Sequence, residues 1–208
     1  MSLSKPIGIL GAGRAGTALA RAAARGGVEV RIASTRTPAQ MRYHLLQYAP
    51  SATAVRAQDI AQGVEIVLLA VPQEDLDDVE PEWIGDRILV DATNRWEEEP
   101  LPEWFEMGLA EGLSSSEVVA RRFPTARVVK ALNHISHWGM DAPRSSEPRA
   151  AAIASNDAAA AAEVGQLVTA LGFEPVIASN LSAGIRTEPG TAYFNVAATP
   201  EQMSRHLL

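Results

Sequence analysis

Short apolar runs with strand character alternate along this chain with stretches of helical composition. Several of the runs are continuously apolar, as expected of strands that are buried on both faces of a parallel sheet. The runs cover residues 5–10, 28–33, 53–57, 64–72, 87–94, 127–134, 149–155 and 174–179. Helices are predicted between them at residues 14–25, 38–48, 115–122 and 157–171. The alternation predicts an α/β fold with a doubly wound, mostly parallel sheet and helices on both faces.

The length of the chain limits how many domains it can hold. Its 208 residues suffice for one domain with a sizeable core, so we expect a single unit over residues 1–208, with about 187–208 as a short C-terminal tail. No apolar run approaches the ~20 residues of a membrane span, and residues 1–10 lack the pattern of a signal peptide. We therefore expect a cytoplasmic protein that does not bind a membrane.

The charge and the cysteine content exclude several function classes. A formal net charge of −7 disfavours binding to nucleic acid or to an anionic membrane surface. The sequence contains no cysteine, which excludes disulfides, thiolate metal sites and a cysteine nucleophile. Any redox chemistry must therefore belong to a bound cofactor.

Three glycines with the spacing G-x-G-x-x-G follow the first apolar run and open the first predicted helix. In a Rossmann-like βαβ unit, such glycines allow a tight turn, close approach of a pyrophosphate and packing of helix against sheet. The free N–H groups at the helix N-terminus would hold the pyrophosphate. The predicted cofactor contacts in this loop are Gly11, Ala12, Gly13, Arg14, Ala15 and Gly16.

The end of the second run indicates which dinucleotide binds. An NAD site would carry an acidic residue there, but Glu29 stands at the beginning of the run, about 10 Å from its far end at ~3.3 Å per residue. The far end carries Ser34, Thr35 and Arg36 instead. Hydroxyl groups, a guanidinium and the next helix N-terminus favour a phosphate, which indicates NADP(H). An ordinary polar turn is the alternative.

Later runs place further residues at the same edge of the predicted sheet. Ala70, Val71 and Pro72 would form an apolar edge beside the nicotinamide. Asn94 and Asn133 follow two other runs; either alone could be a turn former, but their joint placement favours a binding site.

His134 is the one candidate for a catalytic side chain, as a proton donor or as a wall of the substrate site. It lies three residues before His137, but no acidic residue completes a known ligand pattern, so no metal site is predicted. The catalytic group is otherwise unknown.

The segments GILGAGRAGTALA, IASTR, AVP, VDATN, VVKALNHI and LGFEPVIASNLSAGIRTEP, in this order, resemble the F420-dependent NADP oxidoreductase family. That family also includes soluble-domain relatives of the membrane ferric reductases. The resemblance covers the chain to about Pro189.

The resemblance implies reversible hydride transfer between NADPH and a deazaflavin, coenzyme F420, or a related flavin as the small-molecule electron acceptor. It implies that Ser34, Thr35 and Arg36 hold the 2′-phosphate. The implied acceptor-site residues are Ala131, Asn133, His134, Ile135, Gly184 and Arg186. An open cleft for a second cofactor also favours a homodimer. A non-catalytic NADP(H)-binding sensor and a reductase of another small acceptor stay open as alternatives.

Overall fold

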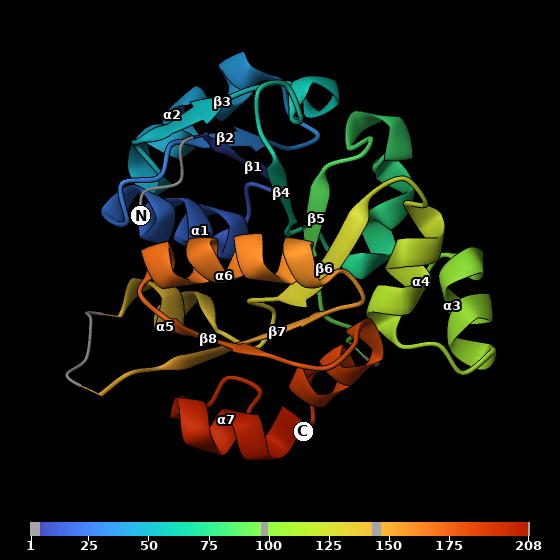
Figure 1. The fold of residues 1–208 in the computed structure, drawn as a ribbon. Helices are drawn as coiled ribbons and strands as arrows, with labels where there is room; N and C mark the ends of the chain where they lie inside the picture. The colour runs from blue at the N-terminus through green and yellow to red at the C-terminus, as the bar shows by residue number, and fades with distance from the viewer. Residues whose placement is uncertain (1–4, 97–99, 143–146, 208) are drawn as a thin grey trace.

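The computed structural model describes residues 5–96, 100–142 and 147–207, and an eight-stranded sheet forms its centre (Figure 1). The strand order is β3-β2-β1-β4-β5-β6-β7-β8, and all neighbours are parallel except β6 and β7. The strands are β1 (Ile7–Leu10), β2 (Val30–Ala33), β3 (Ala52–Ala54), β4 (Ile66–Leu69), β5 (Ile88–Asp91), β6 (Arg127–Ala131), β7 (Ala150–Ser155) and β8 (Glu174–Ile177). The predicted doubly wound, mostly parallel α/β fold is confirmed.

The helices connect the strands along the chain and cover both faces of the sheet. The α-helices are α1 (Arg14–Arg25), α2 (Pro38–Tyr48), α3 (Glu103–Ala110), α4 (Ser115–Arg122), α5 (His137–Asp141), α6 (Ala158–Leu171) and α7 (Pro200–Leu207). Short 3-10 helices are η1 (Ala57–Asp59), η2 (Gln73–Asp78), η3 (Pro81–Trp83) and η4 (Leu181–Thr187).

Side-chain caps start two of these helices where the sequence predicts. At α2, Thr37 Oγ1 accepts a hydrogen bond from the backbone N–H of Gln40, whose side chain accepts one from Thr37 N–H. Ser114 and Glu117 repeat this capping box at α4. Such a box satisfies two N–H groups that a helix start leaves without a partner, so the sequence fixes these two boundaries locally.

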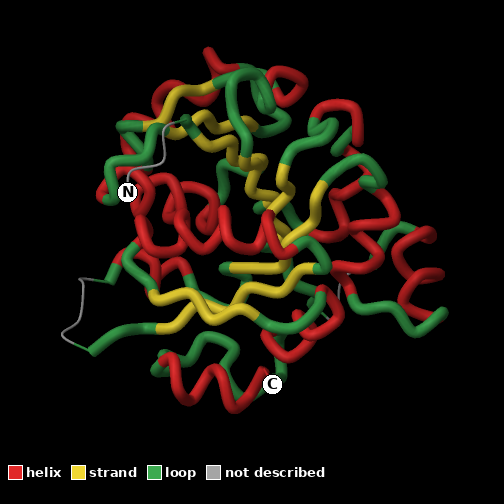
Figure 2. Tube along the Cα trace, in the orientation of Figure 1, coloured by secondary structure: helices red, strands yellow, loops and turns green. Residues whose placement is uncertain are grey.

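Helices cover both faces of the sheet (Figure 2). Alternate residues of the buried strands pack against them in two cores, one on each face. Ile9 of β1 and Val90 of β5 point to the face that α1 and α6 cover, whereas Leu10 and Leu89 point to the opposite face, beside α4. This alternation explains why the strands are apolar without interruption.

The C-terminal residues pack on the sheet rather than extending from it. Helix α7 buries Met203 and Leu207 against small residues of β7 such as Ala152 and against Val176 of β8. The chain before α7 also reaches the sheet, since Ala150 N–H donates to the Ala198 carbonyl at 2.8 Å.

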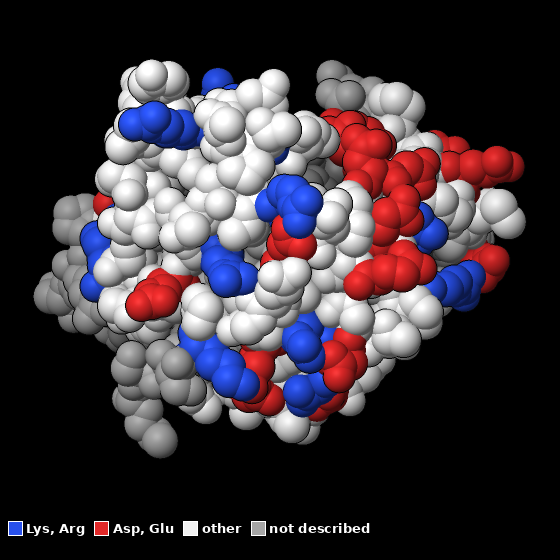
Figure 3. Space-filling model, turned by 90° about the horizontal axis from the view of Figure 1, so that it is seen from above, with Lys and Arg blue, Asp and Glu red and all other residues white. Residues whose placement is uncertain are grey.

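Acidic side chains gather on the side of the molecule that carries α3 in Figure 1, whereas the basic side chains are more dispersed in the view of Figure 3. No helix within the described ranges has the length and the apolar content that crossing a bilayer requires.

Candidate functional site

The glycine loop is held against the end of β4. Gly11 has φ +112°, and a Cβ atom there would come within 2.2 Å of the Ala70 carbonyl oxygen. Gly16 meets the loop from the other side, because its Cβ would come within 1.8 Å of Gly11 O. Only glycine allows these two backbone approaches, so both positions serve the shape of the loop itself.

Gly13 differs from these two glycines because it faces open space. A Cβ built there meets no atom within 4 Å, and Gly13 caps α1 without a side-chain hydrogen bond. Gly13, Arg14 and Ala15 are exposed at this helix start. The loop thus presents the backbone N–H groups of a helix start to open space, which fits the pyrophosphate of a dinucleotide.

A first hollow of about 220 Å³ lies along this loop. It brings together residues that the sequence predicts at three strand ends. It is lined by Leu10, Gly11, Ala12, Gly13, Ser34, Thr35, Ala57, Ala70, Val71, Pro72, Asp75, Asp78, Val79 and Trp83. The place is the point where the strand order reverses between β1 and β4, which is where open α/β sheets bind their ligands.

The turn after β2 presents a cation beside this hollow. Ser34 Oγ accepts a hydrogen bond from Arg36 N–H at 3.1 Å, which fixes the turn locally. Arg36 is exposed, and within the described residues its guanidinium has no hydrogen-bond or ion-pair partner. Its charge is therefore available to a ligand.

His44 contacts the glycine loop, which the sequence did not indicate. Its Nε2 lies 2.7 Å from the Ala12 carbonyl oxygen, and its ring packs against Tyr48 with centroids 4.8 Å apart. Because a carbonyl only accepts, Nε2 must carry the proton of this hydrogen bond. The contact joins α2 to the glycine loop.

A second hollow, of about 350 Å³, lies on the other side of the α1 N-terminus. Its walls come from α1, the ends of β5 and β6, α5 and the C-terminal segment. It is lined by Ala15, Leu19, Ala92, Asn94, Trp96, Leu132, Asn133, Ile135, Ser136, His137, Trp138, Met140, Phe194 and Asn195. Trp96 and Phe194 meet edge to face with centroids 5.8 Å apart, so residues about a hundred positions apart build one aromatic wall.

Asn94 and Asn133 lie together at this hollow. Asn133 Nδ2 donates to Asn94 Oδ1 at 3.0 Å, and also to the Thr187 carbonyl at 2.9 Å. Asn94 Nδ2 donates to the Asn133 carbonyl at 2.9 Å. Both N–H groups of the Asn133 amide are therefore used inside the protein, whereas Asn94 keeps one for a ligand.

His134 lies behind the wall of the second hollow and does not line it. The residue is 2% exposed, and its Nε2 accepts a hydrogen bond from Ala152 N–H at 3.3 Å. Burial, reinforced by the positive charge of Lys130, lowers the pKa of His134 to about 4. The neutral ring accepts the N–H of Ala152, which lies one residue beyond the last paired position of β6 and β7, so the ring takes the place of a strand carbonyl there.

The structure separates the other predicted acceptor-site residues. Ile135 lines the second hollow, whereas Ala131 is fully buried in the core. Gly184 packs against Lys130, and Arg186 donates to the Leu207 carbonyl at 2.5 Å on the C-terminal side. The turn at Gly184 and Arg186 thus lies behind the wall of the second hollow and does not line it.

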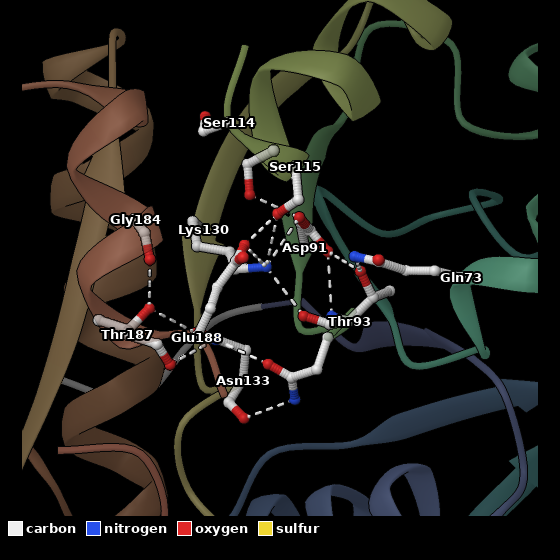
Figure 4. Close-up of polar contacts among 12 residues, drawn as sticks. Gln73, Asp91, Thr93, Ser114, Ser115, Lys130, Asn133, Gly184, Thr187 and Glu188 are labelled. Carbon is white, nitrogen blue, oxygen red and sulfur yellow. Dashed lines mark hydrogen bonds and ion pairs between the residues drawn. The ribbon is translucent and has the colours of Figure 1, made fainter. Parts of the chain in front are cut away.

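A buried polar network adjoins the two asparagines and was missed in the sequence (Figure 4). Lys130 Nζ lies 3.2 Å from Asp91 Oδ2 and 3.4 Å from Glu188 Oε1, and Lys130 and Asp91 are each at most 1% exposed. The available signal was a charged residue at the end of each of two otherwise apolar runs, VDATN and VVKALN.

Solved and curated proteins are similar to this chain over most of its length. A hypothetical protein from Sinorhizobium meliloti has a TM-score of 0.80 and 27% sequence identity, with 93% of this chain and 95% of that chain covered. A candidate F420-dependent NADP-reductase from Arthrobacter sp. FB24 has a TM-score of 0.73 and 26% identity, with 94% and 100% covered. Metalloreductase STEAP3 of Rattus norvegicus is 29% identical over 185 residues, which are 88% of this chain and 35% of that relative. The chain thus spans about a third of the length of this curated relative.

The Rossmann-type sheet, the glycine loop and these similar proteins define the class: the chain has a Rossmann-type dinucleotide-binding fold similar to that of NADP-dependent oxidoreductases. Within that class, residues 6–95 match the model of the family described as NADP oxidoreductase, coenzyme F420-dependent. The resemblance predicted from the sequence is confirmed.

Proposed function

We propose that the protein transfers a hydride between NADPH in the first hollow and a deazaflavin or flavin-like acceptor in the second, with coenzyme F420 as the first choice. One observation supports this most strongly: the N-terminus of α1 borders both hollows. Gly13 lines the first hollow, and Ala15, two residues later, lines the second. Two ligands bound there would meet at the helix start.

The first hollow would hold the dinucleotide by its phosphates. The N–H groups around Gly13 would hold the pyrophosphate, and Ser34, Thr35 and Arg36 would hold the 2′-phosphate. Ala70, Val71 and Pro72 line the hollow and would form an apolar edge that excludes water beside the nicotinamide. Arg14, exposed on the first turn of α1, adds positive charge near the pyrophosphate.

When bound, NADPH would supply a hydride from C4 of its nicotinamide and be released as NADP⁺. The hydride and one proton from solvent would reduce the acceptor, so charge and electrons balance. Such a transfer requires alignment of two carbon atoms more than a protein acid or base. The neutral, buried His134 agrees with this requirement.

The walls of the second hollow suit a planar aromatic ring. Trp96 and Phe194 offer an aromatic surface, Leu132 and Ile135 offer apolar contact, and Asn94 offers one amide N–H. Pockets for ring-shaped ligands combine apolar walls with a few placed polar groups in this way.

Anaerobic mixing of the protein and NADPH with F420, FMN, FAD or a quinone tests the proposal. We expect rapid NADPH oxidation with F420 and slower oxidation with the others. Trp96→Ala should raise the KM for the acceptor and leave the Kd for NADPH unchanged, and Trp104→Ala, on α3 outside both hollows, is the matched control. Tight binding of NADPH without oxidation by any acceptor would contradict the proposal and favour a non-catalytic sensor.

A further inference from the structure

Three charged side chains meet in the interior near the carboxyl ends of β5 and β6 (Figure 4). They are Lys130, Asp91 and Glu188, whose side chains are 1%, 0% and 14% exposed. None of them lines either hollow. Removing charges from water is costly, and a buried ion pair contributes little net stability, so this cluster is not explained as a source of stability.

Nearly every polar atom of the cluster has a partner. Lys130 Nζ donates to the Thr93 carbonyl at 2.8 Å, and Asp91 Oδ1 accepts from Thr93 Oγ1 at 2.7 Å. Asp91 Oδ2 accepts from Ser116 Oγ at 2.6 Å, and Ser115 Oγ donates to Glu188 Oε1. A buried network in which the groups are satisfied is rigid, and its members fix one another's positions.

The cluster also fixes where the C-terminal segment crosses the strand ends. Glu188 reaches Lys130 from just beyond η4. Within η4, a Cβ at Gly184 would come within 2.8 Å of Lys130 Cγ and 2.9 Å of its Cβ. The segment therefore lies directly on the Lys130 side chain, at a distance that only glycine permits.

Thr187 links the C-terminal segment to the wall of the second hollow. Its carbonyl accepts one N–H of the Asn133 amide at 2.9 Å, and its Oγ1 lies 3.1 Å from Asn133 Oδ1. Thr187 directly precedes Glu188, so the ion pair with Lys130 determines where Asn133 finds its partner. Asn133 in turn orients Asn94, its partner in the wall of the hollow.

Backbone strain is concentrated at the same hollow. Within the described residues, Leu132 and Asn195 are the non-glycine residues with positive φ, at 67° and 58°, and both line the second hollow. Asn195 N–H donates to the His134 carbonyl at 2.8 Å, so the two strained segments are joined. For a bulky residue such as Leu132 this conformation is unfavourable and persists only where the surroundings over-determine it.

We propose that Lys130, Asp91 and Glu188 form a positioning cluster that holds the C-terminal segment against β6 and thereby fixes Leu132, Asn133 and Asn195 in the wall of the second hollow. The cluster acts through Thr187 and does not touch a ligand. Its effect on turnover rests on the proposed function, because the second hollow is the acceptor site in that proposal. Its effect on the backbone of residues 132–136 and 191–196 does not rest on the proposed function.

Glu188→Gln tests the cluster, because it keeps the size of the side chain and removes the charge that faces Lys130. Glu163→Gln is the matched control, since Glu163 pairs with Arg127 at 3.3 Å at the opposite end of β6. In the full chain we expect amide hydrogen exchange of residues 132–136 and 191–196 to be about tenfold faster in Glu188→Gln than in the control. With saturating NADPH, the KM for F420 should rise about tenfold, while the Kd for NADPH stays within about twofold.

Equal exchange rates and equal KM values in the two variants would overturn the positioning role. If Glu188→Gln does not fold, Ser115→Ala provides the same comparison, because it removes the hydroxyl that contacts both Glu188 and Lys130. If no acceptor is reduced by any form of the protein, the proposed function fails, and the exchange rates alone then decide whether the cluster positions the hollow.

Discussion

Asn133 and Asn94 hold each other at the ends of neighbouring strands, since each donates to an oxygen of the other, at 3.0 and 2.9 Å. Asparagine after a strand is commonly only a turn former. Here the pair joins β5 to β6 in the wall of the second hollow, and Thr187 fixes it from the C-terminal side. The edge of the sheet is thus pre-organised on the side where the acceptor is proposed to bind.

Replacement by alanine should have different effects at two glycines of the glycine loop: loss of cofactor binding at one and loss of folding at the other. Gly13→Ala should fold normally, because its Cβ meets no protein atom, but should weaken both NADPH and NADH by at least about 1.5 kcal/mol, or roughly tenfold. Gly16→Ala should fail to fold, because its Cβ would overlap Gly11 O. Circular dichroism and fluorescence titration measure the two effects. Normal cofactor binding by Gly13→Ala would show that the pyrophosphate does not cross this glycine.

Arg36 should distinguish the two dinucleotides. Arg36→Ala should weaken NADPH by ~1.5–3 kcal/mol, the range for a hydrogen bond to a charged group, and leave NADH nearly unchanged. Arg121→Ala on α4, which removes the same charge far from the first hollow, is the control. Calorimetric titration with both cofactors gives the comparison, and equal losses for NADPH and NADH would show that Arg36 does not read the 2′-phosphate.

His44 should affect both dinucleotides equally, because it supports the backbone of the loop. His44→Phe keeps the ring packed near Tyr48 but removes the donor to Ala12 O. We expect a loss of ~0.5–1.5 kcal/mol for NADPH and NADH alike, the usual range for one neutral hydrogen bond. His44→Gln, which can still donate, should recover part of the affinity. A loss confined to NADPH would instead place His44 at the 2′-phosphate.

His134 should make the stability of the fold depend on pH. Its pKa is about 4 in the folded protein and 6.5 ordinarily, so between these values the unfolded chain binds more protons. The free energy of unfolding should therefore rise with pH between about 4 and 6.5 and level off above. The His134 ring lowers that free energy by roughly 3 kcal/mol at and below pH 4 and has no such effect above pH 6.5. Urea unfolding at several pH values compares wild type with His134→Gln. An identical pH dependence in the two proteins would show that the buried imidazole does not titrate in this way.

Much of the fold could be predicted because local patterns determine it. The bounds of α1, α2 and α4 follow from the glycines at 26–27 and from two capping boxes, each contained in a few consecutive residues. Helix α3 could not be predicted, because it begins after Pro102 without a side-chain cap. Helix α5 was not predicted either, since its five residues are too few to show a period.

The candidate site could likewise be predicted only where local sequence patterns determine it. The residues of the first hollow that were predicted, such as Gly11, Ser34 and Ala70, stand at strand ends, and strand ends can be recognised in a sequence. Glu188 meets Lys130 across 58 residues, and Phe194 meets Trp96 across 98. A single sequence gives no information on such long-range pairings. The burial of His134, just after β6, likewise depends on the pairing of β6 with β7.

Transfer of a deuterium label from C4 of NADPH to F420 in a single turnover tests the central claim most directly. The acceptor carbon of a deazaflavin does not exchange its hydrogen with water, so a direct transfer keeps the label. The account predicts that the label is recovered on reduced F420 and that NADP⁺ forms in equal amount. Recovery of the label in water, or tight NADPH binding without any transfer to F420, would contradict it.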